Sequence, residues 1–216
     1  MKKLLFSFSL FLWSGYLLMA QNNYPEPEFN NEVYLYRKDS TNKLLRLEKN
    51  SSKMDSKLKM GGFGGAESGY YIEGEASPVR LSNGNNLSFI FSNGGVEKKS
   101  SAYMDSIMKA NGVDPATAQA MGIGGNGDPA SSITLYKTTA EKGQRKIFLQ
   151  KTGGMFGSKK NTSSAKYSFS VKKIKEGYWE MVIDKTLPKG EYAFTLMGMG
   201  MGNMDGGVSL LAFAVD

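Results

Sequence analysis

The clearest alternation of apolar and polar residues lies in the last quarter of the chain. Between residues 165 and 172 every second side chain is apolar: Ala165, Tyr167, Phe169 and Val171. This alternation is typical of a strand with one buried and one solvent-exposed face. Turn signals at 176–177 and 187–190 separate it from further predicted strands at 178–183 and 192–196. Residues 208–215 are apolar on both faces, which predicts a central strand.

Further short strands are predicted earlier, separated by clusters of glycine and asparagine. The runs rich in apolar or β-forming residues are 33–37, 44–47, 69–75, 87–91, 133–137 and 146–150. The turn signal at 141–143 predicts that the last two runs pair as a hairpin. About ten strands at this spacing predict an all-β fold, either an antiparallel β-sandwich or a jelly-roll-like barrel.

One segment departs from the strand pattern. Apolar residues between 103 and 108 recur at helical spacing, and Gly112 follows them as a stop signal. Asp114-Pro115 is typical of a second helix start, which would end at Gly122. We therefore expect a short helical insertion near 100–122 within the β-domain.

The beginning of the sequence has the pattern of an export signal. Lys2 and Lys3 precede the uncharged apolar run 4–18, and Ala20 supplies a small residue before Gln21. The run is shorter than the ~20 apolar residues that a membrane-spanning helix needs. We expect residues 1–20 to be a signal peptide cleaved near Ala20, 21–31 a flexible leader, and 32–216 a single β-domain. The exported protein would be periplasmic, cell-surface or extracellular.

Composition narrows the chemistry that the chain can perform. Its 216 residues include no cysteine and no histidine. Disulfides, metal sites ligated by Cys or His, cysteine nucleophiles and the Ser-His-Asp triad are therefore excluded. The net charge is +7, but the basic residues are spread along the chain and are not interleaved with aromatic residues. We expect no nucleic-acid partner, no cofactor and no catalytic residue.

Glycine clusters interrupt the strand pattern at four places. The chain has 26 glycines, and many of them gather with large apolar residues in segments 60–65, 122–127, 153–157 and 197–207. Residues 122–127 match G-x-G-x-x-G, but a predicted helix precedes and a predicted strand follows, the reverse of a dinucleotide site. We expect glycine-rich connecting loops; the alternative is that several converge at one end of the sandwich as a recognition surface.

The last glycine-rich segment also holds a methionine cluster. Its members are Met197, Met199, Met201 and Met204. Thioethers bind soft ions such as Cu(I), so these residues are the candidate soft-metal ligands. The alternative is that they fill irregular gaps in the core.

Glu73 and Glu75 are the candidate carboxylate pair. Two residues apart on a predicted strand, they would share a face, and a glycosidase needs two carboxyl groups ~5–10 Å apart. The alternative is a solvated acidic pair. Four aromatic residues could stack on a sugar, although strand alternation places the tryptophan in the core: Tyr70, Tyr71, Tyr178 and Trp179.

Two C-terminal segments carry a resemblance. The sequence LPKGEYAF at 187–194 and FAVD at 213–216 resemble the ending of a loose family of secreted, uncharacterised proteins of Gram-negative bacteria. Residues 72–74 and 79–81 fit earlier parts of the same pattern. The resemblance implies an exported all-β domain and brings no catalytic residues with it.

The expected function is therefore that of an exported, non-catalytic β-domain that binds a partner or belongs to the cell envelope. The sequence leaves the partner unknown, and a glycan or an envelope component is the candidate. Two alternatives stay open: a carbohydrate-active enzyme or glycan-binding module, and Cu(I) binding through the methionine-rich loop.

Overall fold

The computed structural model describes residues 24–39, 42–58, 65–94, 129–153, 162–196 and 207–216. These residues form mostly antiparallel sheets with one short helix, α3 (Pro129–Ser132), which confirms the expected all-β sandwich. The predicted signal peptide, the helical insertion near 100–122, the G-x-G-x-x-G match and the four methionines lie outside the described residues.

Sheet A has five strands in the order β12-β13-β7-β1-β2. They are β1 (Glu32–Arg37), β2 (Lys43–Arg46), β7 (Ser88–Ser92), β12 (Phe169–Lys175) and β13 (Tyr178–Ile183). All neighbours are antiparallel, and β7 joins the early hairpin β1–β2 to the late hairpin β12–β13.

Sheet B has six strands, with the order β11-β8-β14-β15-β3 and a parallel pairing of β6 on β15. They are β3 (Glu48–Lys53), β6 (Arg80–Leu81), β8 (Ile133–Lys137), β11 (Lys166–Tyr167), β14 (Gly190–Leu196) and β15 (Gly207–Val215). Sheet C has the order β4-β5-β10-β9. Its strands are β4 (Asp55–Leu58), β5 (Gly65–Glu73), β9 (Thr139–Glu141) and β10 (Gln144–Gly153).

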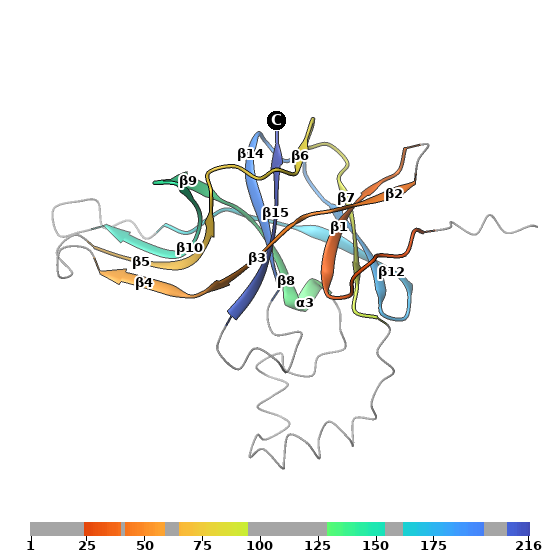
Figure 1. Ribbon diagram of the computed structural model, residues 1–216, viewed down its shortest axis with the longest axis horizontal. Helices are drawn as coiled ribbons and strands as arrows, with labels where there is room; N and C mark the ends of the chain where they lie inside the picture. The colour runs from red at the N-terminus through yellow and green to blue at the C-terminus, as the bar shows by residue number, and fades with distance from the viewer. Residues whose placement is uncertain (1–23, 40–41, 59–64, 95–128, 154–161, 197–206) are drawn as a thin grey trace, which may run out of the picture.

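Sheet B lies between the other two sheets, as Figure 1 shows. One core joins sheets A and B, and its buried side chains include Val33, Phe89, Phe91, Trp179, Met181, Leu135, Tyr192, Phe194, Leu211 and Phe213. A second core joins sheets B and C through Tyr70, Ile72, Ile147, Tyr136, Ala193, Leu210 and Ala212. Strand β15 contributes to both cores, which is the physical reason why residues 208–215 are apolar on both faces.

The alternating stretch at 165–172 serves two sheets. Tyr167 belongs to β11 in sheet B, whereas Phe169 begins β12 in sheet A. Tyr167, Phe169 and Val171 are half-buried and pack against the core between these sheets, while Ser168 between the strands is exposed. The predicted inward face is confirmed for Tyr167, Phe169 and Val171, whereas Ala165, which precedes β11 and was expected on the same face, is exposed.

The predicted hairpin between 133–137 and 146–150 is wrong. The turn at Lys142-Gly143 joins β9 to β10, and Lys146 pairs with Thr139. Strand β8 pairs instead with β14 and β11. Leu135 and Tyr136 are both buried and project from opposite faces of the strand, so β8 needs a place within sheet B rather than at the side of a hairpin.

Candidate functional site

The outer face of sheet A, which turns away from sheet B, carries buried polar side chains. Alternation along β1 places Val33 in the core and Glu32 on the outer face. In β13 the same alternation places Trp179 in the core and Glu180 on the outer face. Glu32 is 1% exposed and Glu180 is 3% exposed. Charged groups are buried in this way only where something covers them and supplies partners.

Residues 24–31, which we call the strap, supply part of that cover. The Tyr24 hydroxyl donates a hydrogen bond of 2.8 Å to the Glu180 carboxylate. The Tyr24 ring lies 5.4 Å from the Tyr36 ring and 6.4 Å from the Tyr178 ring, measured between centroids. The Tyr178 hydroxyl donates to the backbone carbonyl of Pro25. This end of the strap is therefore held by one carboxylate and two aromatic rings of sheet A.

The other end of the strap is held by β1, β2 and β7. The Phe29 backbone N–H donates to the Tyr34 hydroxyl at 3.1 Å. The Arg46 guanidinium lies 4.3 Å from the centre of the Phe29 ring, a cation–π contact. The Ser92 hydroxyl donates to the Asn30 side chain at 3.1 Å. Figure 1 shows this segment leading into β1. The strap forms no strand, and its contacts with sheet A are the part of the candidate site that the sequence did not indicate.

Glu180 is ionised beneath the strap. Burial opposes its ionisation, but hydrogen bonds from Lys38, Ser88 and Tyr24 outweigh burial and lower the pKa of this carboxyl below its usual value. The Lys38 ammonium and the Ser88 hydroxyl each lie 2.5 Å from the same carboxylate oxygen. Burial and the bond to Glu180 raise the pKa of Tyr24 to about 12, so its hydroxyl stays protonated and donates.

Glu32 is a second ionised carboxylate on this face. Burial disfavours its charge, but Arg46 and Lys49 outweigh burial and lower the pKa of the carboxyl. Arg46 donates through two nitrogens at 2.8 and 2.9 Å, and Lys49 donates at 2.9 Å. The outer face of sheet A thus combines ionised carboxylates at its centre with cationic side chains around them.

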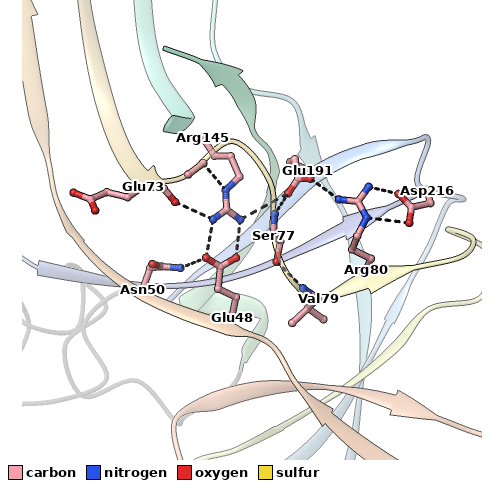
Figure 2. A network of polar contacts seen from close by, with 10 residues as sticks. Glu48, Asn50, Glu73, Ser77, Val79, Arg80, Arg145, Glu191 and Asp216 are labelled. Carbon is pink, nitrogen blue, oxygen red and sulfur yellow. Dashed lines mark hydrogen bonds and ion pairs between the residues drawn. The ribbon is translucent and has the colours of Figure 1, made fainter. Parts of the chain in front are cut away.

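A separate polar network lies between sheets B and C (Figure 2). Arg145 of β10 is 1% exposed and donates to both oxygens of Glu48 at 2.7 Å. Its guanidinium also lies 3.7 Å from Glu191 of β14. Arg80 then lies 3.5 Å from Glu191 and donates to Asp216. The charges alternate in sign along this row, so the network joins β3, β6, β10, β14 and the end of β15.

Glu48 is ionised within this network. Burial opposes its charge, whereas hydrogen bonds from Arg145, Ser77 and Asn50 lower the pKa of its carboxyl below the usual value. Arg145 also donates to the backbone carbonyls of Gly74 and Glu73, at 3.1 and 3.2 Å. These hydrogen bonds are typical of a structural ion pair, and not of a carboxyl group that donates a proton.

The structure does not place Glu73 and Glu75 together on one strand face. Strand β5 ends at Glu73, and Gly74 has φ of +82°, so Glu75 lies beyond the strand. Both side chains are exposed, and Glu75 accepts a hydrogen bond of 2.9 Å from the Gly143 backbone N–H. Figure 2 shows the Glu73 carboxylate pointing away from Arg145, which meets only its backbone carbonyl.

The four aromatic residues do not form an exposed platform. Tyr70, Tyr178 and Trp179 are buried, and the prediction that Trp179 belongs to the core is confirmed. Tyr71 is half-buried, and the Lys57 ammonium lies 4.8 Å from its ring centre. Sugar stacking on this set would require exposed ring faces that three of its members lack.

The glycine-rich segments lie almost wholly outside the described residues. Of the described residues beside them, Leu196 pairs with both Ile133 and Ser209 in sheet B. Gly65 pairs with Gly153 in sheet C. The alternative that several of these segments converge on one recognition surface therefore stays a prediction.

Among the described residues, no group of three or more Asp or Glu side chains could hold a metal ion. Within the same residues, none of the helices has both the length and the apolar character that a membrane span requires.

Comparisons with known proteins give no relative from which a role could be transferred. Neither a protein-family model, nor a curated protein, nor a solved structure matches the chain significantly. Function is therefore inferred from the geometry of the chain itself.

Proposed function

We propose that the chain is an exported β-domain that acts by binding and not by catalysis. The observation that carries this proposal is the ionisation state of three carboxyl groups in the polar contacts described above. Glu32, Glu48 and Glu180 are held ionised by cationic and hydrogen-bonding partners. General acid catalysis needs the opposite, a sheltered carboxyl group with a raised pKa. Export is supported by the N-terminal sequence pattern and by the resemblance to secreted proteins.

The exposed carboxylates provide the test of this proposal. We expect purified protein to show no turnover of a broad panel of glycosides and esters, because Glu73 and Glu75 lie in solvent. Glu73→Gln and Glu75→Gln should behave like the unaltered chain, as should the control Glu176→Gln in the β12–β13 turn. Turnover that either of the first two variants abolishes, with folding and the control unaffected, would favour the carbohydrate-active enzyme. Glycan-array binding without turnover would favour the glycan-binding module.

Export predicts a defined new N-terminus. We expect the secreted protein to begin at Gln21, because Ala20 supplies the small residue that signal peptidases require before the cut. The strap would then begin three residues after the new N-terminus. Edman sequencing or intact mass of secreted material measures the position. A cytoplasmic protein that retains Met1 would contradict export.

A further inference from the structure

The strap is held mainly by side chains of sheet A. Residues 24–31 belong to no strand, and Tyr24, Pro25, Phe29 and Asn30 contact side-chain groups of the sheet. The sheet contacts the strap's backbone at the Pro25 carbonyl and the Phe29 N–H, and the strap's side chains at Tyr24 and Asn30. The backbone contacts hold an extended segment in place, and the side-chain contacts select its residues. The outer face of sheet A therefore has the properties of a peptide-recognition surface.

The strap is also separate from the hydrophobic cores. The buried clusters of the described residues contain nothing before Val33. Removing the strap from the sheet would therefore break polar and aromatic contacts while leaving both cores assembled. Local opening of a segment that contributes little to the core costs less free energy than global unfolding.

The charges of the strap and of the surface around it are complementary. The strap carries Glu26 and Glu28, and Glu26 pairs with Lys175 of β12. The negative charge of Glu28 helps to raise the pKa of Arg46 in β2. Pro25 and Pro27 favour an extended conformation, which lowers the entropy lost when such a segment docks.

We propose that the outer face of sheet A is a docking surface for an extended, acidic partner segment that carries tyrosine and proline. The strap occupies this surface in the chain's closed form. This inference rests on the proposed binding function and names its surface and partner class. The partner's tyrosine takes the place of Tyr24 against Tyr36 and Tyr178, with its hydroxyl on Glu180. An acidic residue two positions later pairs with Lys175.

A labelled peptide with the strap's own sequence, YPEPEFNN, tests the surface directly. The protein is the mature full chain with Tyr24→Ala and Glu26→Lys, which weaken two contacts of the tethered strap. We expect this variant to bind the peptide about tenfold more tightly than the unaltered chain, because the intact strap competes at high effective concentration. Fluorescence anisotropy measures both affinities.

Two matched changes test the predicted contacts. A peptide with phenylalanine in place of its tyrosine should bind about tenfold more weakly, because it lacks the hydrogen bond to the charged Glu180. Adding Lys175→Glu to the single variant Tyr24→Ala, whose strap keeps Glu26, should weaken peptide binding, and a peptide with lysine in place of its first glutamate should restore it. Failure of that charge reversal would remove Lys175 from the recognition surface and contradict the proposed register.

A loosened variant that keeps the tryptophan fluorescence and unfolding transition of the unaltered chain but does not bind the peptide would overturn the proposal. If that variant does not fold, amide hydrogen exchange of the unaltered chain tests whether the strap opens locally. We expect the Phe29 and Asn31 amides to exchange at least about a hundredfold faster than the β13 amides. Equal rates would overturn the proposal, because the strap would then leave only on global unfolding.

Two further outcomes distinguish a foreign partner from a second copy of the chain, and the docking surface from the proposed binding function. A concentration-dependent dimer that Lys175→Glu abolishes would overturn the proposal of a foreign partner, because the strap of a second copy would then occupy the surface. Glycoside or ester turnover would refute the proposed binding function whatever the peptide does. Absence of peptide binding without turnover would refute the docking surface alone.

Discussion

Replacing Arg145 with methionine should lower the free energy of unfolding by about 3–5 kcal/mol, because removal of one partner leaves buried charges uncompensated. Methionine fills a similar volume but cannot donate a hydrogen bond. Glu48 would lose its bidentate partner, and the carbonyls of Gly74 and Glu73 would lose their donor. Urea denaturation followed by tryptophan fluorescence measures the change.

Arg80 is the matched control for Arg145. It belongs to the same network, but its side chain is 48% exposed and its partner Asp216 is 47% exposed. Water replaces the partners of an exposed ion pair, so Arg80→Met should destabilise the protein much less. Equal losses for Arg80→Met and Arg145→Met would show that burial of the arginine does not determine its contribution.

A double variant distinguishes the ion pair from simple packing. Arg145→Met with Glu48→Gln removes both charges, so the second substitution should recover part of the stability lost in the first. Additive losses would mean that Arg145 acts through its two carbonyl contacts and its packing, and not through Glu48.

The strands that the sequence predicted best are those whose pattern depends on burial alone. Residues 208–215 were expected to be a central strand, and β15 lies between β14 and β3 with one core on each face. The alternation at 165–172 likewise predicts the inward face of β11 and β12, although Ala165, just before β11, is exposed. Such patterns report which side of a strand meets other side chains, and they do not report which strand is the neighbour.

Pairing between distant strands lay outside what periodicity can predict. The sequence correctly indicates the turn at Lys142-Gly143, which joins β9 to β10. It wrongly predicts that β8 belongs to this hairpin, because β8 pairs with β14 and β11. Arg145 and Glu48 are separated by 97 positions, so no local spacing signals their contact. The same holds for Tyr24 and Glu180, 156 positions apart.

The sequence did not indicate the strap and the outer face of sheet A for a related physical reason. A segment with two prolines and several asparagines predicts little regular structure, and the strap indeed forms no strand. Its order comes from side chains of sheet A, including buried carboxylates that alternation alone would have placed in solvent. An acidic residue at an outward position of a central strand is the sequence signal that could have indicated a covering segment.

Phe194→Ala should lower the free energy of unfolding by about 3–5 kcal/mol, because it leaves a cavity between sheets A and B. Phe194 is fully buried in β14. The centre of its ring lies 4.9 Å from that of Phe89 in sheet A and 6.0 Å from that of Phe213 in sheet B. Both sheets therefore lose contacts at once, and the cavity could close only if the two sheets moved closer together, which the other side chains packed between them oppose.

Phe169→Ala is the matched control at the margin of the same cluster. Its ring centre lies 6.2 Å from that of Phe194, but the side chain is half-buried and water reaches the space it leaves. We expect a loss of about 1–2 kcal/mol, close to the transfer free energy of the part of the ring that is buried against the core. Urea denaturation of both variants gives the comparison. A loss for Phe169→Ala as large as that for Phe194→Ala would show that the edge strand β12, and not the interior of the sandwich, limits stability.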